Sequence, residues 1–70
     1  MTDEIRIRDD HIKLGQALKL SGCVGSGVEA KVMILEGLVK VNGEVCLQRG
    51  KKLFPGDYFE FEDKKIKVTA

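Results

Sequence analysis

Residues 26–43, which read SGVEAKVMILEGLVKVNG, carry the signals for both a helix start and a helix end. Ser26 precedes Glu29 by three positions, the capping-box spacing at which a hydroxyl and a carboxylate each accept one unpaired backbone N–H. A helix is therefore predicted to begin near Gly27. Gly37 then supplies the left-handed residue with which a helix commonly ends, so the chain is predicted to change direction there.

The same segment predicts a β-hairpin directly after the helix. Leu38, Val39 and Val41 are typical of a strand. The dipeptide Asn42-Gly43 that follows is the one that best tolerates the positive φ angles of a tight hairpin turn. The residues after the turn are therefore predicted to run back antiparallel.

The predicted helix has apolar side chains on two surfaces. On a helical wheel they fall into two groups on nearly opposite sides, Val28, Val32 and Leu35 in one and Ala30 and Ile34 in the other. We expect both groups to be buried, so that the helix is wedged between a preceding helix and a following sheet.

Two further elements are predicted before this segment. Residues 4–8 alternate, with Ile5 and Ile7 on one side, which is the period-two signature of a half-buried strand that joins a sheet edge. A helix is predicted over residues 13–20, capped by Asp10 or by a later residue. Because the link to the next helix is short, the two helices are expected to pack as a helix-turn-helix unit.

The rest of the chain predicts strands separated by turns. Residues 44–48 follow the hairpin turn, residues 55–57 (Pro-Gly-Asp) form another turn, and residues 58–62 alternate as a strand. A turn at Asp63-Lys64 leads to a last strand. The predicted fold class is α+β: an N-terminal strand, the helix-turn-helix unit and then a small antiparallel sheet, in one domain that spans residues 1–70.

Length and composition limit the function further. A chain of 70 residues buries only about 60% of its extended surface, which argues against a deep active-site cleft. No apolar run approaches the roughly 20 residues that span a bilayer, and residues 1–8 do not resemble a signal peptide, so a cytoplasmic location is expected. Cys23 and Cys46 lie far apart in sequence and are interpreted as small, partly buried hydrophobic residues rather than a disulfide.

Catalytic and metal-binding patterns are missing from the sequence. The single His11 lies in a predicted exposed turn, where a solvated or capping histidine is the favoured interpretation. One histidine and two separated cysteines do not supply the usual three or four metal ligands. Since glycine-rich nucleotide-binding motifs are also missing, we expect neither an enzyme nor a cofactor.

Basic residues are more informative, although the net charge is only +1. They are predicted on the first helix, the second helix, the strand after it and the following loop: Lys13, Lys19, Lys31, Lys40, Arg49, Lys51 and Lys52. Acidic residues gather in the last strands, at Asp57, Glu60, Glu62 and Asp63. The charge pattern is equally compatible with a phosphate-binding face and with scattered surface lysines.

An ordered set of residues resembles a known family. These residues are Leu14, Leu18, Gly22, Ser26, Ala30, Ile34, Gly37, Val39, Val41, Asn42, Gly43 and Gly56-Asp57. The set resembles the RNA-binding module of small-subunit ribosomal protein S-four, also called the alpha-L motif, over residues 12–61. The short chain and its Gly50-Lys51-Lys52 loop look most like small free-standing bacterial members.

The resemblance implies an RNA-facing surface made by the second helix, its N-terminal approach and the hairpin loop. Carried over to this chain, that surface contains Ser26, Lys31, Lys40, Asn42, Arg49, Lys51 and Lys52. Most members have an arginine directly after the capping serine, where this chain has Gly27, so a bare helix N-terminus takes the place of a bidentate ligand. The expected partner is a structured ribosomal or transfer RNA, recognised through its backbone, with ribosomal or assembly proteins as further partners.

Three other functions remain open. A protein-interaction module could use the acidic strand face. A single-strand stacking platform would need exposed rings among Phe54, Tyr58, Phe59 and Phe61. A sulfur carrier with a β-grasp-like sheet shares the V-N-G-E and G-D patterns, but such carriers end in a diglycine and this chain ends in Val-Thr-Ala.

Overall fold

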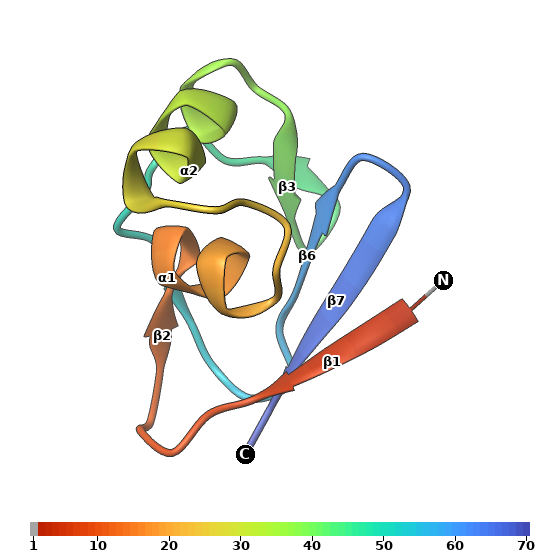
Figure 1. The fold of residues 1–70 in the computed structure, drawn as a ribbon. Coiled ribbons are helices and arrows are strands. Elements are labelled where there is room, and N and C mark those ends of the chain that lie inside the picture. Colours follow the sequence, from red (N-terminus) through yellow and green to blue (C-terminus); the bar gives the residue numbers. More distant parts are fainter. Residues whose placement is uncertain (1) are drawn as a thin grey trace.

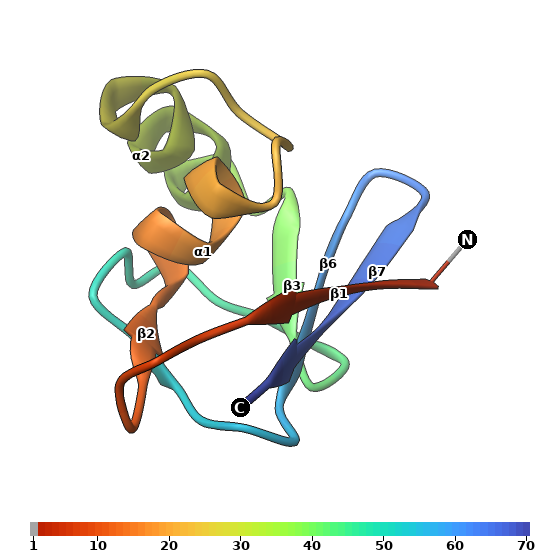
Figure 2. The same cartoon turned by 60° about the horizontal axis from the view of Figure 1, so that its bottom comes forward.

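The computed structural model describes residues 2–70, with two helices on one side of a five-stranded sheet (Figures 1 and 2). The elements follow one another as β1 (Thr2–Arg6), β2 (Ile12–Lys13), α1 (Leu14–Leu20), α2 (Gly27–Leu35), β3 (Val39–Val41), β4 (Glu44–Val45), β5 (Lys52–Leu53), β6 (Tyr58–Phe61) and β7 (Lys64–Thr69). This architecture confirms the predicted α+β class. Within residues 2–70, neither helix is long and apolar enough to cross a membrane.

The main sheet joins the two ends of the chain. Its strand order is β1-β7-β6-β3-β4, with β1 parallel to β7 and the other neighbours antiparallel. The N-terminal strand lies at the sheet edge as predicted, but it begins and ends two residues earlier than expected. Beyond its end, the N–H of Ile7 donates to the carbonyl of Thr69 at 2.8 Å, so the contact with β7 continues. The short strands β2 and β5 form a separate antiparallel pair. Neither the parallel pairing nor this second pair was predicted.

The ends of α2 follow the sequence signals closely. The hydroxyl of Ser26 accepts the N–H of Glu29 at 3.2 Å, whereas the Glu29 carboxylate accepts from Gly25 at 3.4 Å, one residue before the expected partner. At the other end Gly37 has a φ of 77° and its N–H donates to Ile34. The predicted start and end of this helix are therefore confirmed.

The expectation that both apolar surfaces of α2 are buried is wrong. Ala30 and Ile34 are fully buried against α1 and the sheet. Val28, Val32 and Leu35 are instead 74%, 44% and 60% exposed. The reason is that α2 lies on the outside of α1, farther from β1 and β7, and no element of residues 2–70 covers its outer side (Figures 1 and 2).

The first helix begins at Leu14 rather than at Lys13, which belongs to β2. No side chain caps α1, so the predicted cap at Asp10 is also wrong. The N–H of Leu14 donates instead to the carbonyl of Lys51 at 2.9 Å, and the N–H of Gly15 donates to the carbonyl of Arg49 at 3.1 Å. The loop before β5 therefore satisfies helix donors that a local cap would otherwise satisfy.

The hairpin turn is confirmed, with φ angles of 51° at Asn42 and 89° at Gly43. The strand after it is shorter than predicted, because regular pairing ends at Val45 rather than continuing to residue 48. The last turn lies at Glu62 and Asp63, one residue before its predicted position. The predicted inward-facing side chains of the last two strands are all buried: Phe59, Phe61, Ile66 and Val68.

A side-chain contact joins the hairpin to the turn before β6. The amide of Asn42 donates to the Asp57 carboxylate at 3.2 Å, and its oxygen accepts the N–H of Tyr58 at 3.1 Å. The other oxygen of Asp57 accepts the N–H of Phe54 at 2.8 Å. The Asn-Gly and Gly-Asp signals, far apart in sequence, therefore form one hydrogen-bonded unit.

Replacing Asp57 by Ala should lower the free energy of unfolding by about 1.5–3 kcal/mol, because it removes hydrogen bonds to a charged group. Asn42→Ala should cost about 1–2 kcal/mol, and the double variant should be less destabilised than the sum by at least about 0.5 kcal/mol. Urea denaturation measures the free energy of unfolding of the two single variants and the double variant. Glu44→Ala, at an exposed position, serves as a control. Additive losses would show that the two side chains are not coupled.

Candidate nucleic-acid interface

Three predicted cations meet at the start of α2. Lys13, Lys19 and Arg49 line a depression of about 390 Å³, whose other walls include Gly27, the first residue of α2, and Gly15 on α1. The depression is open to solvent and contains no acidic side chain. Such a surface attracts an anion and lacks the enclosure that catalysis commonly needs.

The position of Arg49 depends on Gly15. The backbone carbonyl of Arg49 accepts the N–H of Gly15, and a Cβ atom at residue 15 would lie 2.7 Å from Cγ of Arg49. The aliphatic part of the arginine therefore lies directly on the α1 backbone, where any other residue would displace it. A glycine in the first turn of a helix is the one signal in the sequence that could have indicated this contact.

Lys52 is a fourth cation of this surface and lies opposite Lys13. In the β2–β5 pair Lys13 and Lys52 are direct partners, and both side chains are exposed. Directly opposite residues of antiparallel strands hold their side chains close together on one face, so two lysines there repel each other. This arrangement concentrates positive charge at a cost in folding stability.

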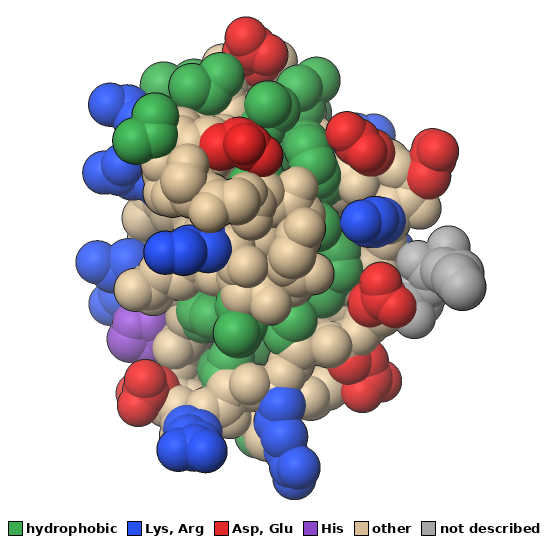
Figure 3. Space-filling view, in the orientation of Figure 1, with side chains coloured by type: hydrophobic (Ala, Val, Ile, Leu, Met, Phe, Trp, Pro, Cys, Tyr) green, Lys and Arg blue, Asp and Glu red, His purple; other side chains and the backbone are tan. Residues whose placement is uncertain are grey.

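Lys31 extends the basic surface along α2. It follows Gly27 by four residues and therefore lies on the same side of the helix, one turn further on. We call Lys13, Lys19, Lys31, Arg49 and Lys52 the cationic cluster. Figure 3 shows Lys and Arg side chains gathered along the left edge of the molecule, over α2, the loop before β5 and the α1–β2 region.

Other predicted site residues lie elsewhere. Val39 and Val41 are buried under the helices, so Lys40 between them projects from the far face of the sheet and does not share the surface of the cationic cluster. The expectation of one continuous face that includes Lys40 is therefore wrong. Lys51 lines a second depression together with Asn42, whose amide is already hydrogen-bonded to Asp57.

Ser26 lies at the entrance of α2 as predicted, and its hydroxyl oxygen accepts a backbone N–H of the first turn. The hydroxyl therefore stabilises the helix start beside the depression. The predicted contact of Ser26 with RNA stays a prediction, as do the contacts of Lys40, Lys51 and Asn42.

The predicted acidic face is interrupted by lysines. Glu60 on β6 has Lys40 and Lys65 as its partners on the two neighbouring strands, so positive and negative side chains alternate across the far face of the sheet. Asp57 is occupied by its hydrogen bonds. The right side of the view in Figure 3 correspondingly shows Asp and Glu side chains with Lys or Arg between them.

The histidine and cysteines are separate from one another. His11 is half-buried, with its ring centroid 5.9 Å from that of Phe54. Cys23 and Cys46 are half-buried, as predicted, and both are free thiols in this structure. Across residues 2–70, no group of three His, Cys, Asp or Glu side chains is placed to hold a metal ion.

The fold and the sequence together define the family. Residues 5–69 match the family described as "S4 domain", and this chain belongs to that family, which is the S-four module named above. YbcJ of Escherichia coli (strain K12) is 38% identical over 60 residues, 86% of each chain. The Bacillus subtilis (strain 168) protein named "Probable ribosome maturation protein RlbA" is 44% identical over 62 residues, which cover 89% of this chain and 87% of RlbA.

A solved structure agrees with this assignment. The solution structure of E. coli YbcJ, described as revealing an alfaL motif involved in RNA-binding, superposes with a TM-score of 0.70 at 35% identity. The match covers 99% of this chain and 86% of the YbcJ chain. The resemblance to the alpha-L motif is therefore confirmed, and it extends from the two helices to the whole sheet.

Replacing Lys52 by Glu should raise the free energy of unfolding by about 0.2–1 kcal/mol, because it turns a repulsive cross-strand pair into an attractive one. Thermal or urea denaturation at low salt measures the gain, which should shrink at about 1 M NaCl as screening increases. The double variant Lys13→Glu/Lys52→Glu restores like charges and should lose the gain. A single variant less stable than the parent would contradict the proposed repulsion.

Proposed function

We propose that this protein binds structured RNA, with the cationic cluster engaging the phosphate backbone. The observation that supports this function best is the convergence of Lys13, Lys19 and Arg49 at the start of α2. What is said of the relatives agrees with it, since the YbcJ structure is described as revealing a motif involved in RNA-binding and RlbA is named for ribosome maturation. Ribosomal RNA in the cytoplasm is therefore the partner we propose.

The mechanism follows from the kind of groups present. Arg49 can hold two phosphate oxygens at once, while the lysines act as mobile point charges around it. The first N–H groups of α2, beside Gly27, add partial positive charge at the same place. Contacts of this kind go to the backbone, so the protein should recognise the shape of a folded RNA rather than its base sequence.

Aromatic stacking contributes little to this surface. Phe59 and Phe61 are buried, and the ring of Tyr58 has the Lys65 ammonium 4.2 Å from its centroid. Phe54 is 47% exposed, but it contacts His11 rather than the cationic cluster. The single-strand stacking platform left open by the sequence is therefore the weaker interpretation.

The double variant Lys13→Gln/Arg49→Gln should reduce affinity for a ribosomal RNA fragment at least about 10-fold at moderate salt, because it removes two phosphate contacts. For the parent, log affinity should fall with log salt at a slope of about −3 to −5, and the variant should lower the magnitude of that slope by about 1.5–2. Filter binding measures both quantities.

The matched control is Lys64→Gln/Lys67→Gln on β7, which removes the same charge away from the depression and should leave most of the affinity in place. Unstructured poly(U) should bind more weakly than the folded fragment. Equal losses in both double variants, or a parent that does not retain the folded RNA, would reject the proposed function.

Gly15→Ala tests the contact that positions Arg49. Alanine has a higher helix propensity than glycine by up to about 1 kcal/mol, but its Cβ displaces the Arg49 side chain, which opposes that gain. The free energy of unfolding should therefore change by less than about 1 kcal/mol. Affinity for the same RNA should fall about 5-fold, as one charge-assisted contact is lost. Gly25→Ala, where a Cβ meets nothing within 4 Å, should leave affinity unchanged. An unchanged affinity of Gly15→Ala would show that Arg49 needs no fixed position.

A second candidate function is protein contact within a ribosomal assembly. The exposed side chains Val28, Val32 and Leu35 on the outer side of α2 favour it, whereas the interrupted acidic face does not. Nuclease treatment separates the two functions. A complex isolated from cells that survives complete RNA digestion would support protein contact, and one that dissociates would support RNA binding.

A further inference from the structure

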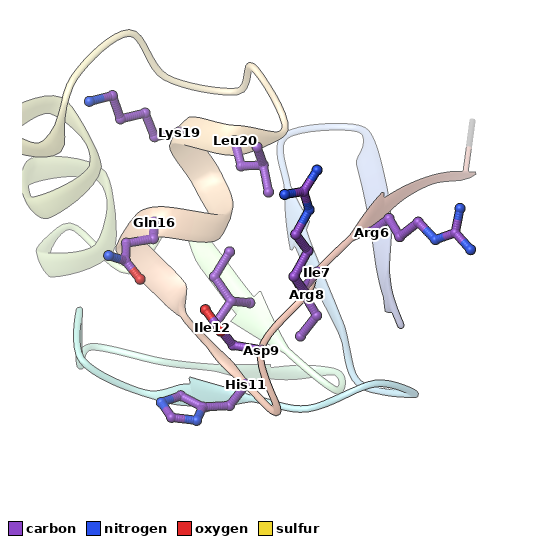
Figure 4. Close-up of a pocket in the computed structure, with 9 residues that line it drawn as sticks. All are labelled: Arg6, Ile7, Arg8, Asp9, His11, Ile12, Gln16, Lys19 and Leu20. Carbon is purple, nitrogen blue, oxygen red and sulfur yellow. The ribbon is translucent and has the colours of Figure 1, made fainter.

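A larger groove lies on the other side of α1 from the depression at the start of α2. It has a volume of about 730 Å³ and runs between α1 and the segment that follows β1 (Figure 4). Gln16 and Lys19 line both the groove and the depression, so the two form one continuous surface. The groove is of the size that small-molecule sites commonly have, about 300–1,000 Å³.

The side chains of the groove differ in kind from those of the cationic cluster. Ile7, Ile12 and Leu20 give it an apolar lining, and Leu20 remains 58% exposed there. Arg8 points toward Leu20 from the opposite wall, whereas Lys19 points away from Arg8, toward the segment that leads into α2 (Figure 4). The groove thus offers a flat cation and an apolar surface, with further positive charge at its border.

Asp9 adds a single carboxylate to this basic and apolar lining. A carboxylate there disfavours a phosphate beside it and favours a ligand that presents hydrogen-bond donors. A nucleobase has apolar faces that can lie between a guanidinium and a leucine. Guanine in addition presents two adjacent N–H donors on its Watson–Crick edge, which a carboxylate can accept together.

Backbone contacts hold the groove wall in place. The N–H of Ile7 donates to the carbonyl of Thr69 at 2.8 Å, and the hydroxyl of Thr69 donates to the carbonyl of Ile5 at 3.1 Å. These bonds fix the end of β1 against β7, so Arg8 and Asp9 leave the sheet from a defined position. A preformed wall reduces the conformational entropy that a ligand has to remove.

We infer that the groove binds one unpaired nucleotide, preferably a guanosine, of an RNA whose backbone lies on the cationic cluster. This inference rests on the proposed function and adds to it a preference for an RNA with a bulged or looped-out base. Arg8 and Leu20 hold the faces of the base, and Asp9 accepts its donors. Lys19 bridges the two parts of the surface.

Fluorescence anisotropy with three RNA hairpins of identical stems tests the inference. One hairpin is fully paired, one carries a single bulged G and one a single bulged U. The parent protein should bind the bulged-G hairpin about 10-fold more tightly than the paired one, as stacking and base-edge contacts of this kind commonly give. The bulged-U hairpin should fall between them.

Two variants separate the groove from the cationic cluster. Leu20→Ala should reduce the ratio of bulged-G to paired affinity severalfold, and Asp9→Asn should reduce the ratio of bulged-G to bulged-U affinity. Ratios are used because a change in charge alters the affinity for every RNA equally. Leu47→Ala, also an exposed leucine, and Asp63→Asn serve as matched controls that should keep both ratios.

The outcomes distinguish the two proposals. A parent that binds all three hairpins equally, or groove variants that keep both ratios, would overturn the nucleotide site and leave backbone binding in place. A parent that binds none of the hairpins and no ribosomal RNA fragment would reject the proposed function and the groove together. Thermal denaturation of each variant shows whether a lost preference comes from a lost fold.

Discussion

The backbone N–H groups at the start of α1 require a contact that places Arg49 and Lys52 of the cationic cluster beside Lys13. A helix start leaves four N–H groups without partners inside the helix, and α1 has no side-chain cap. The carbonyls of Arg49 and Lys51 accept two of them, so the loop before β5 has to lie against the helix. Because the arginine side chain follows its backbone, satisfying the helix also fixes a cation beside Lys13.

The same contact explains why two lysines face each other. Once the loop lies against α1, β5 pairs with β2, and the inward positions of this short pair are taken by Ile12 and Leu53. The outward positions are Lys13 and Lys52, whose backbones the pairing holds directly opposite each other. Their repulsion costs about 0.2–1 kcal/mol, while each capping hydrogen bond contributes about 0.5–1.5 kcal/mol, so the capped arrangement remains favourable. An anion that binds there relieves the repulsion, which adds to its affinity.

Signals confined to a few neighbouring residues predicted the structure well. Ser26, Gly37 and Asn42-Gly43 each act through backbone angles or bonds within four residues, and all three lie where the sequence indicated. The parallel β1–β7 pairing and the β2–β5 pair join residues from distant parts of the chain and leave no local signal. The exposure of Val28 was missed for a related reason. A helical wheel separates the faces of a helix but does not show whether another element covers each one.

The predicted site residues show the same difference between local signals and contacts of distant parts of the chain. Helical periodicity is enough to place Lys31 on an exposed side of α2, and strand periodicity is enough to place Lys40 opposite Val39 and Val41. Periodicity does not show which exposed faces lie next to one another, because that depends on how the helices and strands pack. The groove between α1 and the end of β1 is the clearest case, because Leu20 and Arg8 come from elements that the sequence treats as unrelated. A basic residue in the segment after a strand and an apolar residue on a helix each have an ordinary local explanation. Only their position on opposite walls of one groove, continuous with Lys19, gives the pair a chemical meaning.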